Sequence, residues 1–281
     1  MASHSYIKWL GDKTKLGAVI RSHMPEKYAA HIEPFAGSGA LFFETLPQCA
    51  VLADTNERLV RTHIAVRDKP ELVIDLLRTY RNDPDFYYSM RDNWRAVDAA
   101  SDVDVAACMI YWSKTAHGGI YRVNGKNEFN VPFGKYKSPR FCDAEKIRAC
   151  SAALQGVSID CASFETTMLR AEEGDFIYAD PPYAKLDTAS FVGYTADGFS
   201  GKQHQLLRDL AVELARRGVF VLISNADAPG VRELYRGNGF RIEEVKVRRN
   251  IAVKGRDRGV VSELLISNYP SRRGSLKMTG T

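Results

Sequence analysis

A short apolar run that ends in an acid and two prolines constrains the fold of this chain more than any other stretch. Residues 176–179 read Phe-Ile-Tyr-Ala, and Asp180, Pro181, Pro182 and Tyr183 follow at once. A continuous apolar run of this length is typical of a strand buried on both faces, and the prolines end it. In an open α/β sheet, ligands bind beyond the carboxyl ends of the strands, so the motif predicts a site. A proline-rich turn that only caps the strand is the alternative.

The same four residues suit a flat base that carries an exocyclic amine. The carboxylate of Asp180 can accept one N–H of the amine, and the restricted backbone can aim the carbonyl of Pro181 at the other. Tyr183 offers a face on which the base can stack. We therefore predict that the catalytic residues are Asp180, Pro181, Pro182 and Tyr183.

A second candidate motif, Glu-Pro-Phe-Ala-Gly-Ser-Gly-Ala, occupies residues 33–40. It follows an apolar run and precedes a helical pattern over 41–46. Gly37 and Gly39 allow a tight turn and a close approach to a ligand, and the helix start attracts a carboxylate or a phosphate. The sequence lacks the third glycine of a dinucleotide fingerprint and has no Gly-Lys-Ser/Thr phosphate loop. A structural strand-to-helix turn therefore remains the alternative.

Asp54 ends the next predicted strand, at 51–54. An acid at this point can bind both hydroxyls of a ribose, as it does in dinucleotide folds. It can also cap the helix that begins near Asn56, and both roles are compatible.

Predicted strands and helices alternate on both sides of a long insert, which favours an α/β sheet. The predicted elements are a helix at 14–24, strand–helix units over 31–67, helices over 70–115, a helix from about 143, strands at 157–161 and 219–223, a helix at 202–216, and an antiparallel pair at 240–253 and 260–267. We predict a discontinuous catalytic domain at 1–68 and 143–270 around an insert at 69–142. The tail at 271–281 is expected to be disordered.

The insert carries a basic segment that suits a nucleic-acid groove. Residues 120–137 alternate polar and apolar side chains around a Gly-Lys-Asn turn, which predicts a β-hairpin. Between Lys114 and Arg140 there are six basic residues and one acid, a net charge as large as the +5 of the whole chain. Lysines can neutralise phosphates and an arginine can bind guanine through two hydrogen bonds. A solvated basic hairpin without a ligand is the alternative.

Composition is consistent with these patterns. The 281 residues and a 45% hydrophobic share suffice for one large α/β domain with an inserted subdomain. Five cysteines without a Cys-x-x-Cys pair argue against a disulfide framework and against a zinc site, so we expect no metal. No apolar stretch approaches membrane-spanning length and no signal pattern opens the chain. We expect a reduced, cytoplasmic protein that does not bind a membrane.

Taken together, the glycine turn, Asp54 and the Asp-Pro-Pro-Tyr motif resemble the amino-methyltransferases that use S-adenosylmethionine. The motif order, with residues 9–13 first, then the glycine turn, the insert and the acid motif, is similar to the Dam-type class of DNA adenine-N6 methyltransferases. The resemblance extends over about residues 6–270. It implies a Rossmann-like methyltransferase sheet of the α/β class with a terminal antiparallel hairpin, and a helical and β-hairpin insert that recognises the target.

The resemblance implies S-adenosylmethionine as the cofactor. It places Trp9 and Lys13 at the methionine end of the cofactor, and Ser163 and Phe164 against its adenine, although Phe164 also suits a core. Phe199 matches a family position near the same pocket, whereas Asp12 departs from the family, where a glycine is common. The implied cofactor-binding residues are Trp9, Lys13, Phe35, Ala36, Gly37, Ser38, Gly39, Asp54, Ser163, Phe164 and Asp180.

The resemblance also implies double-stranded DNA as the partner and a monomer as the acting form. Arg122 matches the position that reads the guanine of the target, which is expected to be GATC or a related site that contains GA. The adenine must leave the stack to be methylated, and His117 stands where an aromatic triplet usually supplies the wedge. The implied DNA-binding residues are His117, Ile120, Arg122, Asn124, Asn130, Pro132, Tyr136 and Lys137. Association with the nucleoid follows from DNA binding, whereas an orphan, phage-borne or restriction–modification role stays open.

Two other functions remain as alternatives. A methyltransferase of RNA adenine or of protein glutamine uses similar chemistry, although Asp180 rather than an asparagine disfavours glutamine. A DNA-binding module without catalysis is disfavoured by the intact motifs. No cysteine lies beside the acid motif, which disfavours cytosine-C5 methylation.

Overall fold

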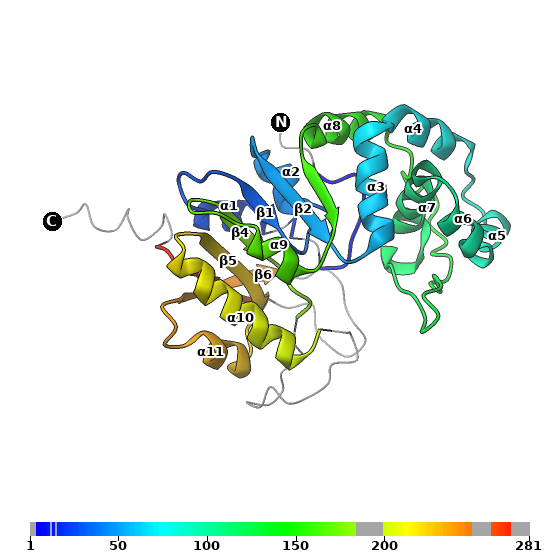
Figure 1. Ribbon diagram of the computed structural model, residues 1–281. Coiled ribbons are helices and arrows are strands. Elements are labelled where there is room, and N and C mark those ends of the chain that lie inside the picture. The colour runs from blue at the N-terminus through cyan, green and yellow to red at the C-terminus, as the bar shows by residue number, and fades with distance from the viewer. Residues whose placement is uncertain (1–3, 12, 15, 184–198, 249–259, 271–281) are drawn as a thin grey trace. The chain divides into compact units, whose positions relative to one another are not determined.

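The computed structural model describes residues 4–11, 13–14, 16–183, 199–248 and 260–270. The chain forms two compact units (Figure 1). The first unit comprises Met1–Thr14, Ala36–Leu46 and Asp54–Cys161, and the second comprises Lys15–Phe35, Pro47–Ala53 and Ala162–Thr281. The predictions for Asp12, for the end of the strand at 240–253 and for the tail at 271–281 lie outside the described residues.

The second unit contains six strands of a mixed sheet, in the order β2-β1-β4-β5-β7-β6. Strands β1, β2, β4 and β5 are parallel, whereas β7 pairs antiparallel with both β5 and β6. The strands are β1 (His31–Glu33), β2 (Ala50–Asp54), β4 (Phe176–Ala179), β5 (Phe220–Ala226), β6 (Arg241–Arg248) and β7 (Val260–Ser267). The seventh strand, β3 (Ser158–Cys161), is counted with the first unit. The predicted α/β class and the terminal antiparallel pair are confirmed.

Strand β4 forms the centre of the second unit because all four of its residues are buried. Apolar residues on both faces of a parallel strand require cover on both faces of the sheet. Helices α9 and α10 pack against each other and α10 packs against β5 (Figure 1). The helices of this unit are α1 (Gly17–His23), α9 (Phe164–Leu169), α10 (Gly201–Arg216) and α11 (Pro229–Tyr235).

The first unit is mainly helical, with α7 at its centre against α3 and α4 (Figure 1). Ser101 and Asp104 form a capping box that starts α7, and ten of the fourteen residues of this helix are buried. The predicted run of helices over 70–115 is confirmed. The helices are α2 (Ala40–Thr45), α3 (Glu57–Asp68), α4 (Pro70–Thr79), α5 (Pro84–Asp92), α6 (Trp94–Ala99), α7 (Asp102–Thr115), the 3₁₀ turn His117–Gly119 and α8 (Ala144–Leu154).

The segment at 120–137 reverses direction as predicted but forms no regular strands. Its residues make only isolated antiparallel bridges, Val123 with Phe129 inside the segment and Phe133 with Ala116 before it. The side chain of Asn124 accepts hydrogen bonds from the backbone N–H groups of Lys126 and Glu128. A side chain that binds nearby backbone in this way competes with a strand ladder, which explains why the predicted β-hairpin is incomplete.

Within the described ranges, no helix is long and apolar enough to cross a membrane. The same residues contain no group of three or more His, Cys, Asp and Glu side chains placed to hold a metal ion. The division into a catalytic domain and an insert at 69–142 stays a prediction, because the two compact units reflect packing and not function.

Candidate active site

Asp180 directly follows the carboxyl end of β4, the strand that lies between β1 and β5 in the sheet. The Ser224 hydroxyl, on β5, donates a hydrogen bond of 2.6 Å to Asp180 Oδ1. The Tyr178 hydroxyl lies 3.0 Å from Ser224 Oγ, and it must be the donor because the Ser224 proton points to the acid. Tyr178 and Ser224 are both buried. Two linked hydrogen bonds therefore fix the carboxylate from inside the sheet.

Tyr183 ends the motif, and its hydroxyl donates a hydrogen bond of 2.7 Å to Glu263 Oε2 on β7. Burial, together with the negative charges of Asp180 and Glu263, raises the pKa of Tyr183 well above its ordinary value. The phenol therefore stays protonated near neutral pH and keeps its donor role. Glu263 itself is only 5% exposed, so this bond orients the ring of Tyr183 from a buried partner.

A group of phenylalanines lies in the same unit. The ring of Phe35 stacks on Phe164, with 5.3 Å between the centroids and 22° between the planes. Phe199, which the family resemblance puts near the cofactor, contacts both rings. Phe164 and Phe199 belong to the buried core, so the core role considered for Phe164 is confirmed. The Ser163 hydroxyl accepts the backbone N–H of Thr166 and caps α9, which gives this residue a structural partner as well.

The glycine turn lies in the first unit from Ala36 onward and is held by two side chains. Gly37 (φ +51°) and Gly39 (φ +67°) both occupy the left-handed region that favours glycine. The Gly37 N–H donates to Asp54 Oδ2 at 3.0 Å, and the Gly37 carbonyl accepts a 2.8 Å bond from His63 Nε2. Because a carbonyl only accepts, Nε2 carries the proton, and His63 Nδ1 accepts from the Tyr6 hydroxyl at 2.6 Å.

Asp54 is half-buried at this turn, and desolvation raises the pKa of its carboxyl. Hydrogen bonds from the backbone N–H groups of Asn56, Gly37 and Thr55 act in the opposite direction. The cap of α3 is Asn56, whose side chain accepts from the Leu59 N–H. The alternative in which Asp54 caps this helix is therefore wrong. A carboxylate has about four acceptor positions, so these backbone bonds still leave capacity for a hydroxyl of a ligand.

The remaining residues predicted at the cofactor surround the same turn. A Cβ atom on Gly37 would lie 3.1 Å from Cδ1 of Trp9, so the Trp9 ring packs directly over the turn. Lys13 is buried, with its Nζ 3.0 Å from the Gly11 carbonyl that accepts from it. Ala36 and Ser38 are buried as well. The first unit thus brings together an acid, a glycine turn, an aromatic ring and a lysine, a donor set that fits a polar cofactor with a ribose and a carboxylate.

The predicted DNA contacts all lie in residues 116–137, which we call the recognition segment. Exposed side chains in this segment include His117, Ile120, Arg122, Pro132, Tyr136 and Lys137, whereas Asn124 and Asn130 are half-buried. Arg122 Nε donates to Asn130 Oδ1 at 2.8 Å, so Asn130 orients the Arg122 side chain. Tyr136 is tied to the 3₁₀ turn, because its hydroxyl accepts from the Gly118 N–H at 3.0 Å.

The sequence did not predict three residues that bind the predicted site residues. Ser224 and Glu263 bind Asp180 and Tyr183, and His63 binds Gly37. Each lies far along the chain from its partner and outside every motif. For Ser224 and Glu263, the only signal in the sequence is a polar residue inside an apolar strand pattern. His63 has no such signal.

Comparison with known proteins gives concordant matches over nearly the whole chain. A family model described as D12 class N6 adenine-specific DNA methyltransferase matches residues 9–251. A type II methyltransferase of Lactococcus lactis subsp. cremoris is 40% identical over 94% of this chain and 95% of its own. A DNA adenine methylase of Vibrio cholerae O1 is 35% identical over 93% of this chain and 94% of its own length. A DNA adenine methylase of Escherichia coli K12 is 34% identical over 95% of this chain and 96% of its own length. The matched residues include both the glycine turn and Asp180.

Proposed function

Because the chain belongs to the D12 class of N6 adenine-specific DNA methyltransferases, we propose that it transfers a methyl group from S-adenosylmethionine to a flipped-out adenine in duplex DNA. The observation that carries this proposal is the position of Asp180. Its carboxylate follows the central strand and is fixed by Ser224, with Pro-Pro-Tyr directly after it. The proposed target is GATC or a related site that contains GA.

The residues around the glycine turn suit separate parts of the cofactor. S-adenosylmethionine, when bound, supplies an electrophilic methyl group on a sulfonium sulfur. Asp54 would accept the ribose hydroxyls, and the missing Cβ of Gly37 lets the Trp9 ring pack closely against the turn. Lys13 would pair with the carboxylate of the methionine moiety, a charge-assisted bond. The remaining proposed contacts are Phe35, Ala36, Ser38, Gly39, Ser163 and Phe164.

Asp180 and Pro181 would activate the amine of the adenine. Conjugation with the ring makes the N6 lone pair a poor nucleophile, and two acceptors aimed at the two N–H bonds localise it. Ser224 holds Asp180 Oδ1, so the acid is pre-organised before the base arrives. Tyr183, anchored through Glu263, would stack on the flipped base. Positioning therefore supplies much of the rate, and no covalent enzyme intermediate is needed.

The recognition segment would contact the duplex. Its exposed lysines would neutralise phosphates, and Arg122 would bind the guanine of the GA core through two hydrogen bonds. His117 would fill the gap that the flipped adenine leaves. We propose that the protein acts as a monomer on nucleoid DNA in the cytoplasm.

The experiment is transfer of labelled methyl from S-adenosylmethionine to oligonucleotides. We expect label in duplex DNA that contains GATC, as N6-methyladenine, and only background in duplex RNA of the same sequence. The isosteric variant Asp180→Asn replaces one acceptor by an amide donor and should lower turnover by about 10²-fold or more. Label in RNA, or near wild-type turnover of this variant, would contradict the proposal. Sequencing of methylated bases from expressing cells then defines the site, and a methylated motif without GA would exclude the proposed target.

A further inference from the structure

Four aromatic rings form a stacked column inside the first unit. Trp9 stacks on Tyr121, with 5.1 Å between centroids and 24° between planes. Tyr121 stacks on Phe129 at 5.7 Å and 29°, and Phe129 stacks on Trp112 of α7 at 4.4 Å and 14°. The column begins at the glycine turn, because Trp9 packs over Gly37. It therefore joins the turn assigned to the cofactor to the recognition segment.

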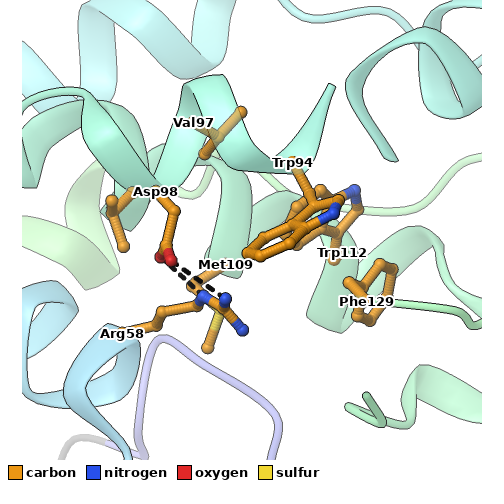
Figure 2. Close-up of a pocket in the computed structure, with 8 residues that line it drawn as sticks. Arg58, Trp94, Val97, Asp98, Met109, Trp112 and Phe129 are labelled. Carbon is orange, nitrogen blue, oxygen red and sulfur yellow. Dashed lines mark hydrogen bonds and ion pairs between the residues drawn. The ribbon is translucent and has the colours of Figure 1, made fainter. Parts of the chain in front are cut away.

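Arg58, the second residue of α3, binds the side of this column. Its Nη1 donates to the Tyr121 hydroxyl at 2.7 Å, and its Nη2 donates to the Asn127 carbonyl at 3.0 Å. Asp98 of α6 receives two further bonds, from Nε at 2.6 Å and from Nη2 at 3.0 Å. The guanidinium also lies 4.9 Å from the centre of the Trp94 ring (Figure 2). One side chain thus holds the recognition segment at two points, at Tyr121 on its first arm and at Asn127 in its turn.

The surroundings of Arg58 leave it no role as a direct ligand contact. The pocket that it lines has a volume of about 10 Å³, room for about one water molecule. Arg58 is 9% exposed, and its five N–H donors are directed at Asp98, Tyr121 and Asn127. Figure 2 shows the guanidinium joined to Asp98 with Trp94 and Met109 close by. Arg58 therefore acts on protein groups and not on a substrate.

The position of Tyr121 determines that of Arg122, the next residue. Tyr121 is half-buried in the column, whereas Arg122 is exposed and bonded to Asn130. The two residues share one planar peptide unit, so they cannot move independently. A shift of the Tyr121 ring would therefore move the Arg122 guanidinium as well.

We propose that Arg58 and Tyr121 are positioning residues that set DNA specificity by fixing where Arg122 meets a base. This inference rests on the proposed function, since it needs Arg122 to face DNA. Neither residue contacts the duplex. A bidentate contact to guanine tolerates little displacement, so loss of the support affects the choice of sequence more than the chemistry.

The test measures kcat/KM on an unmethylated duplex that carries the target site and on duplexes in which one base pair of that site is substituted. The sequence ratio is the first value divided by the second. Arg58→Met and Tyr121→Leu should each lower this ratio at least tenfold, mainly through KM, while kcat on the best duplex changes less than threefold. Tyr121→Phe keeps the stacking and loses only the hydroxyl, so its ratio should fall less than that of Tyr121→Leu. Thermal melting checks that each variant folds. If Arg58→Met does not fold, Arg58→Lys replaces it, because lysine keeps the positive charge but lacks the several N–H donors of the guanidinium.

Arg61 provides a matched control on the same helix. It also makes hydrogen bonds from all three of its nitrogens, but to Asp102, Asp98 O and Ala100 O, none of which lies in the recognition segment. Arg61→Met should leave the sequence ratio within twofold of wild type. An equal loss in Arg61→Met and Arg58→Met would overturn the proposal, because it would indicate general loosening of the helices.

Arg122→Ala separates this inference from the proposed function. If Arg122→Ala does not alter the sequence ratio, the assigned role of Arg122 is wrong and the inference falls with it. If Arg122→Ala lowers the ratio but Arg58→Met and Tyr121→Leu do not, only the positioning role is wrong.

Discussion

The hydrogen bond from Ser224 helps to orient the acid on which the proposed chemistry depends. Ser224 donates to Asp180 Oδ1, and Tyr178 donates in turn to Ser224. A hydrogen bond to a charged group contributes about 1.5–3 kcal/mol, and about 1.4 kcal/mol is a tenfold change in rate. Ser224→Ala should therefore lower kcat about tenfold or more at saturating cofactor and DNA. Tyr178→Phe, which acts one bond further away, should have a smaller effect, and the reverse order would contradict this chain of bonds.

Gly37 combines two constraints that a substitution can separate. Any side chain there must adopt a positive φ, which costs about 1–2 kcal/mol, and its Cβ would also press on Trp9. Gly156 also has a positive φ, of +77°, but a Cβ added to it would meet no atom within 4 Å. Both Gly37→Ala and Gly156→Ala should lose stability in urea unfolding because of the positive φ, and Gly37→Ala should lose at least as much because its Cβ also presses on Trp9. Only Gly37→Ala should weaken the binding of S-adenosylmethionine in calorimetry, and equal affinities would show that Trp9 does not shape the site.

At the scale of the elements, local patterns predicted most of what the structure contains. The buried strand at 176–179, the helices over 70–115 and the terminal antiparallel pair all follow from periodicity and turn residues. The recognition segment differs because Asn124 satisfies its neighbouring backbone with a side chain, which alternation of polar and apolar residues does not reveal.

The candidate site was predictable only where a contiguous motif carries the chemistry. Asp180 and Gly37 stand in such motifs. Ser224, Glu263 and Arg58 do not, because each binds a residue 44, 80 or 63 positions away. Contacts at that separation come from the fold and leave no periodic signal in the sequence.

The recognition segment is also the element whose charge can be tested. Lys137 is exposed and belongs to the basic stretch at 114–140. If it neutralises one phosphate, Lys137→Ala should weaken binding equally for all duplexes and reduce the slope of log K against log salt by about 1. Arg122→Ala should instead reduce the discrimination between sites. Fluorescence anisotropy between about 50 and 200 mM salt measures both, and an unchanged slope for Lys137→Ala would contradict a phosphate contact.

At the scale of the whole molecule, each compact unit buries an uncharged histidine. Burial lowers the pKa of His63 in the first unit, although its bond to the Gly37 carbonyl opposes the shift. Burial lowers the pKa of His204 in the second unit to about 4. Among the described residues, neither ring nitrogen of His204 has a hydrogen-bond partner, and its ring lies edge-on to Phe199 at 4.7 Å. Protonation of either imidazole is therefore coupled to unfolding.

His204 makes the stability of the fold sensitive to acid over a defined range. The unfolded chain binds a proton at this histidine below its ordinary pKa of about 6.5, whereas the folded chain does so only below about 4. Between these values the unfolded state holds more protons, so stability falls as the pH falls, by about 1.4 kcal/mol per unit and about 3 kcal/mol in all. His204→Leu removes this site and fills a similar volume with apolar atoms. Its melting temperature should therefore fall less than that of wild type between pH 7 and pH 4. His4→Leu, at an exposed position, should follow wild type. An equal pH dependence of the melting temperature for His204→Leu and wild type would show that His204 binds its proton equally in the folded and unfolded protein.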